Sequence, residues 1–152
     1  MDEIELTRIL MGNEVTSPYF CGVISHDQLN LRPTPPEGFF VCNTDASDGP
    51  GEHWLVLAWI NQEEPIEFFD SLAKSPDNYH LNFENFLMTQ GSSYKYSIKR
   101  IQASDSIMCG QFCVFYAYHR CKGYSMEDIL AMFSSSDLHR NDIIVDTFVN
   151  NL

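Results

Sequence analysis

The sequence predicts an α+β protein with a mixed, mostly antiparallel sheet and helices packed against it. Residues 39–101 carry short apolar runs, rich in aromatic and β-branched residues and separated by turn residues, which is typical of strands. The N-terminal residues and those from Ile107 onward instead show apolar residues at helical spacing. No internal repeat or low-complexity linker divides the 152 residues, so a single domain over residues 1–152 is expected.

The expected elements follow from local patterns in chain order. The N-terminal helix ends at a glycine, and the proline-rich stretch after it forbids helix and marks a surface connection. Four short strands follow, and one of the later helices opens with a capping box at Ser125. The expected helices are 3–11, 79–88, 106–118, 125–132 and 141–148, the strands are 39–44, 53–60, 66–70 and 94–101, and the connections are 31–38, 48–51 and 61–64.

The composition excludes several classes of function. Nine Lys and Arg against 21 Asp and Glu leave a net charge of −12, whereas a protein that tracks phosphates needs the opposite sign, so DNA is not an expected partner. Five cysteines, an odd number, argue against a secreted disulfide scaffold, and the N-terminus lacks the basic region of a signal peptide. The longest uncharged apolar-rich run, 106–119, is too short to span a bilayer. We therefore expect no membrane partner and an intracellular or virion location.

Cys109 is the predicted nucleophile. The segment 106–118 predicts a buried helix with Ser106 as its N-cap, which puts Cys109 in the first turn. Backbone N–H groups there lack intrahelical partners, and the positive end of the helix dipole favours a thiolate. The alternative is that cysteine is only a small buried hydrophobic residue, and Cys42 and Cys113 fit this alternative well.

A nucleophilic cysteine needs a base, and the base needs an orienting group. His53 lies between a glycine-bearing turn and a strongly apolar strand. If the hairpin turns at Asn61-Gln62, Asp70 lies opposite His53; a four-residue turn slips the pairing by two residues and leaves Asp70 on the same face, within diagonal reach. The alternative is a strand-edge histidine and a solvated aspartate. The other histidines are expected at the surface: His26, His80, His119 and His139.

Gln102 lies seven residues before Cys109, at the end of the last expected strand. Its side-chain N–H, together with the backbone N–H of Cys109, is suited to hold an oxyanion. By composition alone, a lone glutamine is a surface residue.

No metal or other cofactor is expected. A zinc site would have to combine cysteines and a histidine of the C-terminal third of the chain. Cys109 and Cys113 lie one helical turn apart. His119 and Cys121 are expected on other faces of the helix, and no tight turn would bring them close to the first two residues. The residues considered for this site are Cys109, Cys113, His119 and Cys121.

The order and spacing of these residues resemble the adenovirus endopeptidase family, adenain. The chain is more distantly similar to the peptidases that release ubiquitin-like modifiers, which share the His, acid, Gln, Cys order. The seven-residue step from Gln102 to Cys109 favours the adenain branch. The resemblance covers roughly residues 15–120 and is carried by Pro18-Tyr-Phe-Cys-Gly22, Val41-Cys-Asn-Thr44, Gly51-Glu-His-Trp54, Asp70 seventeen residues after His53, and Gln102 to Cys113.

The resemblance implies a papain-like, adenain-like cysteine protease core with its nucleophile at the N-terminus of a buried helix. Trp54, with Gly110 beside the nucleophile, is implied to border the substrate and narrow its channel, which suits cleavage next to glycine. An aromatic core anchor is the alternative for Trp54. The implied catalytic roles are Cys109 as nucleophile, His53 as general base and then acid, Asp70 as orienting carboxylate and Gln102 as oxyanion donor.

The first functional expectation is a cysteine endopeptidase that processes capsid or precursor proteins of a virus or a virus-like DNA transposon. The alternative is a deubiquitinase or an isopeptidase that removes a ubiquitin-like modifier from host conjugates. A non-enzymatic binding module is a third possibility, disfavoured by the intact set of four residues.

The chain departs from the adenain pattern in three ways. Adenain continues beyond the point where this sequence ends, it bonds an activating peptide through a cysteine upstream of the glutamine, and it is basic and uses DNA. Here residues 91–96 contain no cysteine and the chain is acidic. We expect a monomer that acts on a protein substrate without DNA, and a non-covalent peptide activator stays open.

Overall fold

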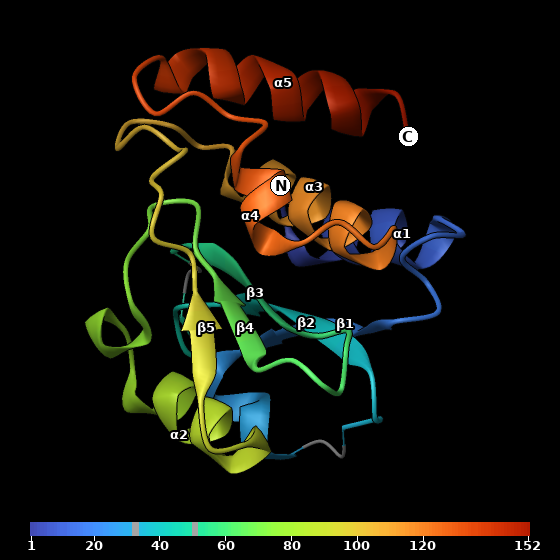
Figure 1. Ribbon diagram of the computed structural model, residues 1–152, viewed down its shortest axis with the longest axis vertical. Helices are drawn as coiled ribbons and strands as arrows, with labels where there is room; N and C mark the ends of the chain where they lie inside the picture. Colours follow the sequence, from blue (N-terminus) through green and yellow to red (C-terminus); the bar gives the residue numbers. More distant parts are fainter. Residues whose placement is uncertain (32–33, 50–51) are drawn as a thin grey trace.

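The computed structural model describes residues 1–31, 34–49 and 52–152. The described residues form a five-stranded sheet in the order β1-β2-β3-β4-β5, with helices on both faces (Figure 1). The proline-rich connection and the turn at 48–51 therefore lie partly outside the described residues. The strands are β1 Phe20–Ser25, β2 Gly38–Asn43, β3 Trp54–Trp59, β4 Ile66–Phe69 and β5 Tyr94–Tyr96; the α-helices are α1 Glu3–Gly12, α2 Leu81–Gln90, α3 Cys109–Cys121, α4 Met126–Leu130 and α5 Leu138–Asn150; 3-10 turns span His26–Leu31 and Pro76–Asn78.

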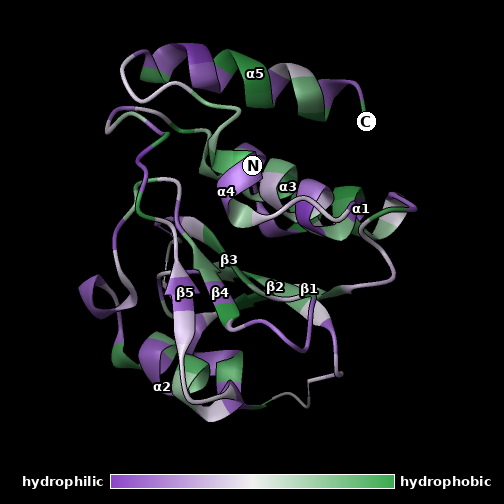
Figure 2. Ribbon diagram, in the orientation of Figure 1, coloured by the Kyte–Doolittle hydropathy of each residue, from purple (hydrophilic) through white to green (hydrophobic). Residues whose placement is uncertain are grey.

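Strand β3 separates two apolar layers. Val56 and Ala58 pack in the layer that contains α1, α3 and α4, whereas Leu55 and Leu57 face the layer that contains α2. Burial on both faces explains why this strand is a continuous apolar run rather than an alternating one. Helix α5 lies outside α3, away from the sheet, and shows both hydrophilic and hydrophobic colours (Figures 1 and 2). In the described part of the chain, no helix is long and apolar enough to cross a membrane.

The predicted α+β class is confirmed, but antiparallel pairing does not dominate the sheet. The two central pairings, β2 with β3 and β3 with β4, are antiparallel. The two outer pairings, β1 with β2 and β4 with β5, are parallel. Parallel neighbours need a crossover connection, and the 3-10 turn after β1 and helix α2 after β4 lie in those connections. Strand β1 was not expected from the sequence, so its parallel pairing was not foreseen.

Two predicted boundaries near the site are wrong. The last strand ends at Tyr96 rather than at residue 101, because the chain leaves β4 there. The helix predicted over 106–118 begins at Cys109 with Met108 at the N-cap, so Ser106 is not the cap. The Ser106 hydroxyl instead accepts a hydrogen bond from the Met108 N–H and donates one to Asp142 of α5.

Most other boundaries agree with the expectation to within one to three residues. The capping box at Ser125 is present, since its hydroxyl accepts from the Asp128 N–H at 3.1 Å. Helix α4 ends at Leu130, two residues before the expected end at Met132.

Candidate active site

His53 and Asp70 meet where β3 begins and β4 ends. Val56 pairs with Phe69 and Leu57 with Phe68, which is the register expected for the longer turn. Asp70 is therefore diagonal to His53, and the two side chains bridge that diagonal with 2.7 Å between His53 Nε2 and Asp70 Oδ1. The period of two along a strand kept both residues on one face, as the sequence predicted.

The Asp70 carboxylate is fully buried and receives three donors. Its Oδ1 accepts from His53 and from the Leu72 N–H at 2.9 Å, and its Oδ2 accepts the hydroxyl of Tyr79. The backbone of Asp70 is held as well, because the Ser97 hydroxyl accepts from its N–H and donates to its carbonyl. These hydrogen bonds offset the cost of burying the polar oxygens of Asp70.

Cys109 is the first residue of α3, and its thiol lies beside His53. Burial raises the pKa of the Cys109 thiol. The contact with His53 and the backbone N–H groups of Trp54 and Gly110 lower it by more than burial raises it, so the net pKa lies below the ordinary value. For His53 the directions are reversed. Burial lowers the pKa of the imidazole, but its contacts with Asp70 and Cys109 raise it to about 9. Both shifts favour the thiolate–imidazolium form of the pair over the neutral form.

Gln102 is buried rather than at the surface, with 2% of its area exposed. Its Oε1 accepts the Ser71 hydroxyl at 2.5 Å, and its Nε2 donates to the Ser106 carbonyl at 3.0 Å. Its backbone N–H donates to the Ser71 carbonyl. These contacts fix the amide with its NH₂ group toward the turn that leads to Cys109. Among the described residues, the second N–H of that group has no acceptor.

Trp54 and Gly110 both contact Met1, which the sequence did not indicate. The Trp54 indole N–H donates to the Met1 carbonyl at 3.0 Å. A Cβ on Gly110 would lie 2.9 Å from the Met1 Cβ, so the Met1 side chain occupies the space that a side chain at position 110 would need. Trp54 and Cys109 line a common cleft of about 370 Å³ that the N-terminal segment borders. The other residues along this cleft are Met1, Asp2, Glu3, Ser25, Asn43, Ala46, Ser47, Gly49 and Glu52.

The other candidate residues lie away from this chemistry. Cys42 and Cys113 are buried, and burial raises the pKa of each thiol. His26, expected at the surface, is buried and stacks on His80 with 4.2 Å between ring centroids. His119, also expected at the surface, is half-buried against Phe115. No group of three or more potential metal ligands occurs within residues 1–31, 34–49 and 52–152.

Local sequence patterns did not identify three residues that hold the site. Tyr79 precedes a helix and carries no motif, and Met1 reaches the cleft only through tertiary packing. Ser71 is adjacent to Asp70, which is the one sequence signal that could have marked it.

Three adenovirus proteases are similar in sequence. The chain is 26% identical to the protease of bovine adenovirus 2 over 124 residues, which are 75% of this chain and 60% of that protein. It is 30% identical to the protease of bovine adenovirus 7 over 89 residues, 51% of this chain and 44% of that protein. It is 25% identical to the protease of bovine adenovirus 4 over 134 residues, 72% of this chain and 67% of that protein.

These matches agree with the resemblance that the motifs indicate: the chain is similar to adenovirus proteases, and it spans about 60% of the length of the bovine adenovirus 2 protease. Among solved structures, the ASFV pS273R protease matches with a TM-score of 0.44 and 23% sequence identity, covering 75% of this chain and 44% of that one. No protein-family model matches the chain.

Proposed function

We propose that this chain is a cysteine endopeptidase that cleaves viral or transposon-encoded capsid or precursor proteins next to glycine. The observation that carries the proposal is one imidazole, His53, that contacts Asp70 at 2.7 Å on one side and the Cys109 thiol on the other. The position of Cys109 at the N-terminus of α3 and the protease names of the adenovirus relatives support the proposal. Relatives from viruses favour an intracellular or virion setting.

In the proposed reaction, the Cys109 thiolate attacks the scissile carbonyl carbon and forms a tetrahedral intermediate. The free N–H of Gln102 and the backbone N–H of Cys109 donate to the oxyanion. His53 gives its proton to the leaving amine, and the C–N bond breaks to leave a thioester. A water molecule, deprotonated by His53, then hydrolyses the thioester, while Asp70 keeps the imidazole oriented throughout.

A preference for glycine would come from the crowded wall beside the nucleophile. Met1 packs between Trp54 and Gly110, so little room is left for a side chain next to the cleaved bond. Peptides with alanine in place of each glycine in turn should lose most of their kcat/KM at the cleavage position alone.

Replacement of the nucleophile tests the proposal. Cys109→Ser should keep the fold, because the residue is small and partly exposed, and should remove turnover of glycine-containing peptides. Alkylation of the wild-type protein, mapped by mass spectrometry, should abolish activity in step with modification of Cys109. Cys121→Ser is the matched control, since that thiol is also half-buried and its pKa is raised to about 12. Full activity in Cys109→Ser would end the proposal.

The same four residues would also serve an isopeptidase. Ubiquitin-like probes with a C-terminal electrophile, tested beside the peptides, separate the two activities. A Cys109 adduct with such a probe, without peptide cleavage, would favour removal of a modifier.

A further inference from the structure

The cleft that contains Cys109 is acidic. Asp2, Glu3 and Glu52 line it, and no Lys or Arg side chain from the described residues does. Even when an amino group at Met1 is counted as one positive charge, the carboxylates leave the lining negative. The proposed reaction assigns no role to these charges.

Two of the three carboxylates are available to a ligand. Asp2 is engaged locally, because it caps α1 and its Oδ1 accepts from the Glu5 N–H at 2.8 Å. Glu3 and Glu52 are exposed, and neither forms an ion pair with any residue that the structure describes. Their charges are therefore not neutralised within the molecule.

Both carboxylates are carried on backbone that is fixed relative to the thiol. Glu3 lies in the first turn of α1, directly after the segment that Trp54 holds through the Met1 carbonyl. Glu52 immediately precedes His53, and its N–H donates to Asn43 Oδ1 at 3.2 Å. These backbone contacts tie both positions to the elements that carry the site, so a charged ligand would meet carboxylates already placed along the cleft.

We propose that Glu3 and Glu52 select substrates that carry a basic residue close to the cleaved bond. This inference rests on the proposed protease function and adds a substrate class to it. Salt screens exposed charges beyond a Debye length of about 8 Å at physiological ionic strength, so carboxylates that line the cleft act mainly on a side chain bound in that cleft. Complementary charge of this kind sets partner choice and association rate more than overall affinity.

Charged thiol reagents test the field without any knowledge of the natural substrate. Cationic aminoethyl and anionic sulfonatoethyl methanethiosulfonate each transfer a thioalkyl group to a thiolate and release methanesulfinate. Normalised to 2-mercaptoethanol, the cationic reagent should modify Cys109 about tenfold faster than the anionic one, and the ratio should fall about threefold with each of Glu3→Gln and Glu52→Gln. The ratio cancels any change in the thiolate fraction of Cys109, and peptide mapping separates this thiol from the other cysteines.

Glu63→Gln is the matched control, because Glu63 is exposed in the turn at the opposite end of β3 and should leave the ratio unchanged. A ratio near one in the wild-type protein, or one that survives in the Glu3→Gln/Glu52→Gln double variant, would overturn the inference.

Paired peptides then test the substrate class. In a glycine-containing peptide set with Lys or Glu fixed at one flanking position at a time, Lys should raise kcat/KM at least fivefold at one position, and the double variant should lose that preference. Turnover without any charge preference overturns this inference and leaves the proposed function standing. No turnover of any peptide, with Cys109 no more reactive than Cys121, overturns the proposed function and this inference with it.

Discussion

Each polar side chain of the site is held by a second residue. The Asp70 carboxylate accepts a hydrogen bond from the Tyr79 hydroxyl, and the Gln102 amide oxygen accepts one from the Ser71 hydroxyl. Asp70 in turn orients His53. Buried polar groups require such partners, and the partners also fix the rotamer that faces the substrate. Replacing a partner should therefore act through geometry, whereas replacing a proposed catalytic group removes its chemistry.

Gln102 and Ser71 allow this distinction to be measured. Gln102→Ala removes the proposed oxyanion donor and should lower kcat by roughly 10²-fold or more with little change in KM. Ser71→Ala leaves the amide but frees its orientation, so a smaller loss of kcat is expected, restored by Ser71→Thr. Steady-state kinetics give the split. A Gln102→Ala variant with raised KM and normal kcat would rule out the oxyanion role.

The pH dependence follows from the His53 and Cys109 pair. Folding raises the pKa of His53 from 6.5 to about 9. The protonated imidazole therefore contributes its whole stabilisation of the folded protein below pH 6.5, and this contribution is lost as the pH rises through about 9. Activity needs the same proton for the leaving group, so kcat/KM should fall on the alkaline side near pH 9. Asp70→Asn removes one cause of the raised pKa of His53, so the alkaline fall in kcat/KM should move to lower pH. The exposed control variant Asp77→Asn should not move it. An alkaline limb at the same pH in Asp70→Asn would contradict the assignment.

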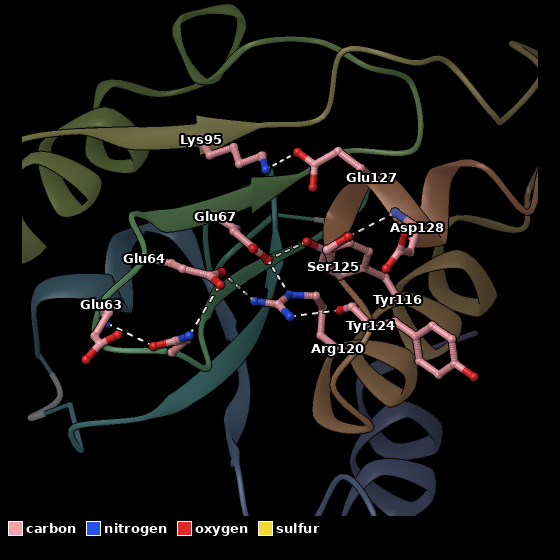
Figure 3. A network of polar contacts seen from close by, with 11 residues as sticks. Glu63, Glu64, Glu67, Lys95, Tyr116, Arg120, Tyr124, Ser125, Glu127 and Asp128 are labelled. Carbon is pink, nitrogen blue, oxygen red and sulfur yellow. Dashed lines mark hydrogen bonds and ion pairs between the residues drawn. The ribbon is translucent and has the colours of Figure 1, made fainter.

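At the scale of elements, a buried ion pair joins α3 to β4 (Figure 3). Arg120 Nε lies 2.9 Å from Glu67 Oε1, both side chains are almost fully buried, and the Tyr116 hydroxyl donates to the same oxygen. This pair fixes the C-terminal half of α3 on the sheet, while the N-terminal end carries Cys109. Nearby, Lys95 of β5 pairs with Glu127 of α4 at the surface.

The two ion pairs should differ greatly in their effect on stability. Arg120→Ala leaves the Glu67 carboxylate buried and unpaired, and should lower the free energy of unfolding by about 3–5 kcal/mol. Lys95→Ala removes an exposed pair and should cost about 1 kcal/mol or less. Urea denaturation of both variants gives the comparison, and equal losses would show that the Arg120 pair is not desolvated as the structure has it.

The sequence predicted the central strands and the His53 to Asp70 pairing because both depend on short-range periodicity. It missed β1, where Gly22 has a φ of 141° and the register shifts, so no clean alternation marks the strand. It overextended β5, because the alternation continues past Tyr96, whereas Lys99 donates to the carbonyls of Leu130, at the end of α4, and of Phe133 beyond it. Partners that come from tertiary packing, such as Tyr79, have no local signature.

At the scale of the whole molecule, the distribution of charge argues against activation by DNA. The net charge is −12, and the four Lys and Arg residues between positions 95 and 120 all contact other parts of the protein. Lys95 pairs with Glu127, Lys99 donates to helix carbonyls, Arg100 donates to the Gln102 carbonyl and Arg120 is buried.

Duplex DNA should therefore change the rate of peptide cleavage by less than twofold at about 0.15 M salt. The measurement is kcat/KM with and without DNA, with a lower salt concentration as the control for weak electrostatic binding. Stimulation of tenfold or more would show that a local basic surface outweighs the overall charge.

The parts of the site come from distant points of the chain: Met1, His53, Asp70, Gln102 and Cys109 meet only after both the central hairpin and α3 are in place. Contacts between such remote positions form late in folding, because loop closure must precede them. Until then Cys109 has neither its imidazole partner nor a structured helix end, and it remains an ordinary, weakly ionised thiol. We therefore expect the thiol of the nascent chain to react like that of an ordinary cysteine, and its pKa to fall only when His53 and the first turn of α3 are in place.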